Sequence, residues 1–260
     1  MSAIALRMTG ADFLKLRRRR WLVLLSLFLT LGILLIIYVV TVIEHASSPG
    51  KYGAAGGTGN FRDGMRVLAL FFGPLAAILI GVEAGTGDAS AGVFRDLVVT
   101  GRSRLALFAT RVPAALALCW AVTLTGFLLL VIGSIAFASN LPTPETSLIL
   151  NGLAFTLLGT GVLCVIAVGF ASFTSSRPGA IVTLIAWQVV ASPLLASIDS
   201  LGSVRKGILS QAIAHFSPVS VEGRRGATVS MSGGTALIVL VLWIAVFLAL
   251  GAWRTRSMDA

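Results

Sequence analysis

Long runs of apolar residues, separated by short polar segments, dominate the chain. Six runs are close to the roughly 20 residues that an α-helix needs to cross the hydrocarbon core of a bilayer. They extend from Trp21 to Ile43, Arg66 to Val82, Val112 to Ala138, Leu148 to Phe173, Gly179 to Ile198 and Gly234 to Trp253. The second run is the shortest and contains Pro74, so we expect a kink or an earlier start there. The pattern predicts an all-α polytopic membrane protein with six transmembrane helices.

Three polar stretches carry a pattern of their own. Residues 1–20 place Leu6, Phe13 and Leu16 near helical spacing, with cations toward the end, which predicts an interfacial amphipathic helix on an anionic leaflet. A frayed basic tail is the alternative. Residues 44–64 are rich in glycine and predict a flexible loop. Residues 199–233 contain apolar residues at helix-like spacing but are too short and polar to cross; they predict a re-entrant or interfacial segment, with a plain surface helix as the alternative.

Composition and charge agree with a membrane protein. The 260 residues are 57% hydrophobic and 12% charged, with a mean hydropathy of +0.96, whereas soluble domains have about 25% charged residues. No soluble block exceeds about 35 residues, so we expect residues 1–260 to form one transmembrane domain without an attached catalytic domain. The net charge of +10 comes from cations that flank the apolar runs, which argues against a nucleic-acid partner.

The cations also predict the orientation in the membrane. With both termini in the cytoplasm, thirteen Lys and Arg residues lie inside and seven outside, and the excess comes from the run that ends in Arg17 to Arg20 beside the first span. The positive-inside rule therefore places both termini in the cytoplasm.

A search for chemistry finds no catalytic constellation. His45 and His215 lie in segments expected outside, Cys119 and Cys164 lie within spans without metal-ligand spacing, and Gly50-Lys51 is followed by Tyr52 instead of completing a Walker A loop. We therefore expect no catalytic residue, metal or cofactor site in this chain. Gln188, in the fifth span, is the most polar residue expected near the middle of the membrane and a candidate for a transport pathway.

The segment "GTGDASAGVFRDLVVTGRSR", residues 85–104, interrupts the apolar pattern between spans 2 and 3. Its centre predicts a short cytoplasmic helix with Phe94, Leu97 and Val98 on one face and Arg95 on the other, between glycines that permit turns. An apolar face in the cytosol favours a partner protein that covers it. An ordinary loop with positive-inside arginines is the alternative, but it does not explain the apolar face.

This segment, with the acid that precedes it, resembles the membrane subunits of type 2 ABC exporters. The likeness extends to the interfacial helix, six spans and re-entrant segment. It implies that residues 85–104 form a coupling helix that docks on an ATP-binding subunit. Glu83 and Gly87 match the opening of the family's segment, Leu97 its docking residue, and Arg102, Ser103 and Arg104 its closing turn. Thr100-Gly101 stands where the family often has proline. The implied interface comprises Glu83, Gly87, Phe94, Arg95, Leu97, Val98, Gly101, Arg102, Ser103 and Arg104.

The resemblance also implies the partners. An exporter of this class has two ATP-binding subunits, which bind ATP and Mg and hydrolyse the nucleotide, and a second permease subunit, identical or related. The membrane would be the inner or plasma membrane of a prokaryotic cell. A stand-alone secondary carrier is the alternative function, although no acid or base is expected near the bilayer centre, where such carriers keep one. An integral-membrane enzyme acting on lipid is a second alternative.

Overall fold

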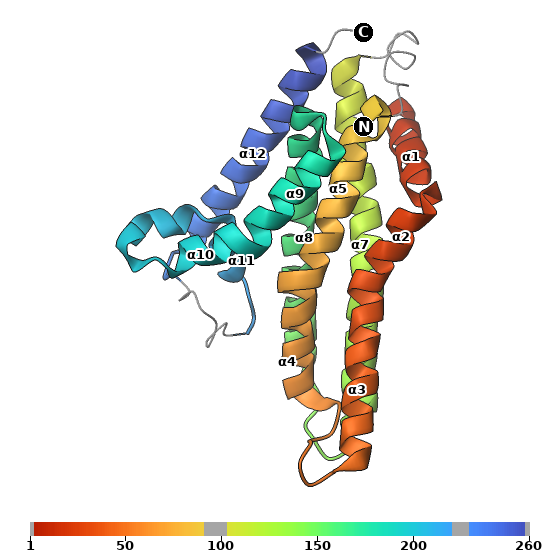
Figure 1. Ribbon diagram of the computed structural model, residues 1–260, viewed down its shortest axis with the longest axis vertical. Coiled ribbons are helices and arrows are strands. Elements are labelled where there is room, and N and C mark those ends of the chain that lie inside the picture. The colour runs from red at the N-terminus through yellow and green to blue at the C-terminus, as the bar shows by residue number, and fades with distance from the viewer. Residues whose placement is uncertain (1–2, 91–102, 220–228, 258–260) are drawn as a thin grey trace.

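The computed structural model describes residues 3–90, 103–219 and 229–257 (Figure 1). These residues form helices joined by short turns, and no strand occurs among them. Six helices in this part of the chain are long and apolar enough to cross a membrane: Arg20–Ser47, Gly57–Gly87, Arg104–Ala136, Thr146–Thr174, Arg177–Ser197 and Gly233–Ser257. The prediction of an all-α chain with six potential membrane spans is confirmed.

Spans 3, 4 and 6 are the single helices α7 (Arg104–Ala136), α8 (Thr146–Thr174) and α12 (Gly233–Ser257). The other spans combine α-helices with a five-residue π-helical turn. Span 1 comprises α2 (Arg20–Leu27), η1 (Phe28–Gly32) and α3 (Ile33–Ser47); span 2 comprises α4 (Gly57–Val67), η2 (Leu68–Phe72) and α5 (Gly73–Ser90); span 5 comprises α9 (Arg177–Ala186), η3 (Trp187–Ala191) and α10 (Ser192–Ser197).

The two ends of the bundle differ in what they contain. Helix α1 (Ala3–Arg18) and the last turns of α12 lie at the same end, at the top of Figure 1. We call this the terminal end. The connections at residues 48–56 and 137–145 lie at the opposite end, which we call the loop end.

Span 2 starts nine residues earlier than the apolar run, at Gly57 instead of Arg66. The reason is that α4 is amphipathic: Phe61 and Met65 are completely buried, while Arg62 and Asp63 on its other side are exposed. Helical periodicity, and not mean hydropathy, defines this part of the span. The prediction of a flexible loop over residues 44–64 was therefore wrong at both of its ends, and the connection between the helices is limited to residues 48–56.

Helix α8 is the centre of the bundle, and α5 and α12 pack closely against it. A Cβ atom on Gly81 would lie 2.5 Å from the backbone oxygen of Cys164, and one on Gly85 would lie 2.6 Å from the oxygen of Val168. On the other side of α8, a Cβ on Gly169 would lie 2.3 Å from the oxygen of Phe247. Small residues let helix backbones approach and gain van der Waals contact where lipid offers no hydrophobic driving force.

Spans 1, 5 and 6 lie at the periphery. Only 22% of the most apolar window of each span is buried, against 72% for span 4. Their outward faces consist of large apolar side chains, including Leu24, Phe28, Val182, Leu194 and Leu242. Such faces fit a hydrocarbon environment.

Helix α1 packs against α7 near the terminal end. Leu16 is buried and Phe13 packs on the core, but Leu6 is 60% exposed, so only part of the expected apolar face contacts the protein. The hydroxyl of Thr110 in α7 donates to the Asp12 carboxylate at 2.9 Å and fixes the middle of α1. The helical prediction for residues 1–20 is confirmed over Ala3–Arg18, while its membrane-surface position stays a prediction.

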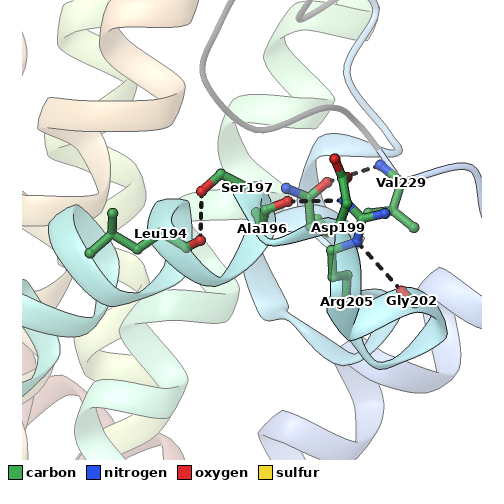
Figure 2. A network of polar contacts seen from close by, with 8 residues as sticks. Leu194, Ala196, Ser197, Asp199, Gly202, Arg205 and Val229 are labelled. Atoms are coloured by element: carbon green, nitrogen blue, oxygen red, sulfur yellow. Dashed lines mark hydrogen bonds and ion pairs between the residues drawn. The ribbon is translucent and has the colours of Figure 1, made fainter.

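The segment between spans 5 and 6 contains the 3-10 element η4 (Asp199–Gly207) and the short helix α11 (Leu209–Ala214). Figure 1 shows these elements beside the middle of the longer helices and away from the loop end. Arg205 donates to the Asp199 carboxylate at 2.7 Å and to the backbone oxygens of Ala196 and Gly202 (Figure 2). These bonds fold the chain back after α10.

The apolar face expected in this segment is confirmed only in part. Ile208, Leu209, Ala212 and Ile213 are buried, but Val204 is 72% exposed because the 3-10 turns of η4 do not continue the register of α11. Whether the segment is re-entrant stays a prediction.

The packing of α5 on α8 predicts a direct test with glycine substitutions. Gly81→Ala should lower the unfolding temperature in mild detergent, because overpacking costs about 1–3 kcal/mol and exceeds the gain in helix propensity of about 1 kcal/mol. Gly59→Ala, in the exposed face of α4 with no atom within 4 Å of its Cβ, is the matched control and should leave the temperature unchanged or raise it. If Gly81→Ala and Gly59→Ala changed the unfolding temperature equally, the packing role of Gly81 would be contradicted.

Candidate functional site at the terminal end of the bundle

Glu83, in the last turns of span 2, is the acid around which the terminal end is organised. Its side chain is completely buried. One carboxylate oxygen pairs with the Arg19 guanidinium and the other with Arg177 Nη2 at 2.8 Å. Arg19 lies between α1 and α2, and Arg177 is the first residue of α9. We call these three residues the Glu83 triad; it joins the ends of spans 1, 2 and 5.

Gly87 borders the triad. It lies one turn beyond Glu83 on α5, and a Cβ there would lie 3.4 Å from Arg19 Nη2 and 3.6 Å from Glu83 Oε1. Both distances are ordinary van der Waals contacts, so a methyl group at this position would touch the ion pair without displacing it. The cavity beside it, lined by the triad's Arg19 and Glu83 together with Asp12, Lys15, Gly87 and Arg111, has a volume of about 20 Å³. That volume is about the size of one water molecule and too small for an organic substrate.

A second set of polar contacts links spans 2, 3 and 4 at the same level. The backbone oxygen of Gly85 accepts from Arg111 Nη1 of α7 at 3.4 Å and from the Ser172 hydroxyl of α8 at 3.2 Å. Arg111 is only 5% exposed although it is charged. Burial lowers the pKa of the Lys15 amine on α1; Asp12 opposes this effect, and Arg111 and Arg19 add to it. The site is thus closely packed and rich in cations.

Ser103 and Arg104 lie where α7 begins, beside the end of α12. The Ser103 hydroxyl accepts from the Ala106 backbone N–H at 3.2 Å and caps α7, as serine commonly does at helix N-termini. Arg104 Nη1 donates to the backbone oxygen of Arg256 at 3.2 Å. On the other side, α5 continues seven residues beyond Glu83, to Ser90. The predicted coupling segment therefore begins and ends on helices that are fixed to the bundle.

The structure describes only part of the predicted ATPase-subunit interface. Glu83, Gly87, Ser103 and Arg104 lie at the terminal end, and the first two form one site. The remaining predicted residues, Phe94, Arg95, Leu97, Val98, Gly101 and Arg102, lie outside the described residues. Their docking role stays a prediction.

Gln188 is not part of this site. It lies in η3, within span 5, and is partly buried. Its neighbour Trp187 packs against Trp243 of α12, with 5.7 Å between ring centroids. No hydrogen bond to the Gln188 amide occurs within the described ranges, so its role in a pathway stays a prediction.

A larger cavity, of about 500 Å³, opens at the loop end. Its lining includes Glu44 and Asp63, with Asn60, whose amide is bonded to the backbone oxygens of Ala54 and Gly56 at 2.8 Å. Asp63 is exposed and paired with Arg66. None of the predicted site residues lines this cavity.

Sequence reasoning singled out Glu83 but missed its partners. Arg19, Arg111 and Arg177 were only counted among the thirteen cations that the positive-inside rule places inside, and Asp12 was not singled out. One signal could have identified two of the partners: an acid at the inner end of an apolar span needs a cation, and Arg19 and Arg177 stand at the same ends of spans 1 and 5. Nothing in the linear pattern indicates that Arg111 approaches Gly85.

The Glu83 triad can hold the ends of spans 1, 2 and 5 together electrostatically. Each carboxylate oxygen of Glu83 has its own guanidinium, and planar guanidinium groups suit such pairs well. No group of three or more His, Cys, Asp or Glu residues that could hold a metal ion occurs in the described ranges. Comparison of the sequence with protein-family models found no match, and no curated protein matched it either. The resemblance to type 2 exporters thus stands on the residues quoted for it.

The burial of Glu83 predicts a measurable loss of stability when its charge is removed. Removing one partner of a buried ion pair costs about 3–5 kcal/mol, but Arg19 and Arg177 are 34% and 48% exposed and can recover water. Glu83→Gln should therefore lower the free energy of unfolding by about 2 kcal/mol, measured by titration from mild detergent into SDS. The exposed pair Asp63–Arg66 provides the control: Asp63→Asn should cost less than about 1 kcal/mol.

Proposed function

We propose that this chain is the membrane subunit of an ATP-driven exporter of the type 2 ABC class. It would work with a second permease subunit, identical or related, and with two ATP-binding subunits that bind ATP and Mg. The observation that carries the proposal is the attachment of residues 85–104. The helix that leads into this segment contains a buried acid held by spans 1 and 5, and the helix that leaves it contacts the end of span 6.

This attachment is what a coupling segment requires. When a partner displaces a flexible loop, the loop absorbs the displacement. When it displaces a segment that is continuous with a helix at each end, the displacement is transmitted to those helices. Here α5 is a continuous helix from Gly73 to Ser90, and α7 begins at Arg104 with a capped N-terminus. Displacement of the segment would therefore act on Glu83 and, through it, on Arg19 and Arg177.

The burial of charge favours this proposal over a stand-alone carrier. Ion-coupled carriers keep an ionisable group near the middle of the membrane, where the substrate pathway can sense it. Glu83 and Arg111 are the buried charged residues in the described ranges, and both lie close to the terminal end. The multi-pass character of the chain agrees with either function. The prokaryotic inner membrane and cytoplasmic termini belong to the proposal.

The docking role of Leu97 can be tested by affinity purification of the tagged chain from gently solubilised native membranes. The wild-type chain should co-purify with a nucleotide-binding subunit and ATPase activity. Leu97→Asp should remove both, because placing a charge in an apolar docking contact costs at least about 2 kcal/mol. The control is Val204→Asp, an exposed apolar residue between spans 5 and 6, which should keep the partner. A wild-type chain that purifies alone would favour the carrier.

The orientation can be tested independently with single cysteines in a background that carries Cys119→Ala and Cys164→Ala. Ser48 and Ser257 are exposed at opposite ends of the bundle. Ser103 is unsuitable because its hydroxyl caps α7. Ser48→Cys should react with a membrane-impermeant maleimide in intact cells, and Ser257→Cys only after permeabilisation. The reverse pattern would place the predicted coupling segment outside the cell and exclude the exporter.

A further inference from the structure

The three spans that meet at the Glu83 triad are also the three that contain π-helical turns. In the described residues, η1, η2 and η3 interrupt spans 1, 2 and 5, whereas α7, α8 and α12 run without such an interruption. A π-helical turn replaces the regular backbone bonds with wider ones, and helices bend there more readily than elsewhere.

The turns lie at a common distance from the triad. Phe28, where η1 begins, is nine positions after Arg19. Phe72, at the near end of η2, is eleven positions before Glu83, and Trp187, where η3 begins, is ten positions after Arg177. At 1.5 Å per residue, each turn is about 14–17 Å from its triad residue along the helix. Spans 1, 2 and 5 thus have terminal-end segments of similar length, each between a charged residue and a turn.

Packing separates these segments into one fixed and two peripheral ones. The terminal-end half of span 2 is held on α8 by the backbone contacts of Gly81 and Gly85. Spans 1 and 5 are mostly exposed to the surroundings of the protein. For these two spans, the ion pairs with Glu83 are the charged contacts to the fixed span 2.

We infer that Glu83 positions the terminal-end halves of spans 1 and 5 against the core, and that each half tilts about its π-helical turn when its arginine leaves the carboxylate. Ser175 and Ser176 join α9 directly to α8, so span 5 tilts between this connection and η3. Span 1 tilts between Arg19 and η1, because α1 stays fixed on α7 through Asp12 and Thr110.

Glu83 is then a shared positioning residue with two separable partners. In an exporter, the same ion pairs would carry a displacement of α5 to spans 1 and 5. This last step rests on the proposed function, whereas the tilting depends only on contacts within the chain.

The test uses the purified full chain in lipid nanodiscs, without Cys119 and Cys164, and one reporter cysteine at a time. Leu22→Cys and Ala180→Cys place reporters at buried positions three residues beyond Arg19 and Arg177. Leu34→Cys and Ala196→Cys place control reporters at buried positions beyond the turns in the same spans. The measurement is the rate of labelling by a water-soluble maleimide, which reports local opening.

Each substitution in the triad has its own expected pattern. Arg19→Gln should raise labelling of the Leu22 reporter alone, Arg177→Gln that of the Ala180 reporter alone, and Glu83→Gln that of both, by at least about tenfold. The two reporters beyond the turns should not change. Glu44→Gln, which removes a carboxylate at the loop end, is the matched control and should change none of the four rates.

Two results would overturn the inference. One is unchanged labelling of both near reporters in Glu83→Gln. The other is an equal rise at all four reporters in either arginine variant, which indicates general loosening. If Glu83→Gln fails to fold, the two arginine variants decide, since each leaves one ion pair intact. No ATPase enters this test, so its failure and failure of the exporter proposal are distinguishable.

Discussion

Burying a carboxylate within a membrane-spanning helix requires compensating charge, and this requirement organises the terminal end of the bundle. An ionised carboxylate that loses its water is stable only when cations and hydrogen bonds replace the lost hydration. Glu83 obtains that compensation from two other spans, through Arg19 and Arg177. The ends of spans 1, 2 and 5 are therefore joined through one residue.

Two kinds of interaction divide the bundle. Close backbone contact at Gly81, Gly85 and Gly169 packs spans 2 and 6 on span 4; such contact is short-ranged and has no alternative arrangement at similar energy. Spans 1 and 5 present much of their surface outward. They are joined to the core by apolar side chains such as Leu22, Ala180 and Leu184, and span 1 also by a close backbone contact of Thr30 at Gly126 of α7. At the terminal end the ion pairs of Glu83 join them to span 2. Arg19 and Arg177 are partly exposed, so water can replace the Glu83 carboxylate as their partner. Helix backbones that touch at a glycine have no such replacement. Movement is therefore expected where the ion pairs hold spans 1 and 5, and not in span 6, which is peripheral but closely packed on α8.

The same end of the molecule carries the segment to which the sequence assigns a partner. Helix α5 precedes this segment and α7 follows it, and both helices are anchored close to the segment by contacts to other spans. The exporter proposal joins these features: a partner outside the membrane acts on the segment, and the Glu83 triad conveys the displacement to the spans.

Much of the architecture was predictable because a bilayer restricts it so strongly. Length and apolarity alone indicated six helices and an all-α chain, since an unpaired backbone is too costly in hydrocarbon to allow other solutions. An earlier start of span 2 was one of two expectations, but its position at Gly57 was not indicated, because α4 buries Phe61 and Met65 with a periodicity that an average over polar glycine-rich residues conceals. Glu83 stood out as an acid at the end of an apolar run.

What the sequence determined by itself is therefore the number and kind of the spans and the place of one acid, Glu83, at the end of an apolar run. Only the tertiary structure decided which cations pair with it. Arg19 and Arg177 are separated by more than 150 residues, and in sequence both resemble the basic flanks that any membrane helix has. The identity of an ion pair depends on which helices pack side by side. Gly81 and Gly85 have the spacing of a close helix contact, but this spacing does not say which helix they meet.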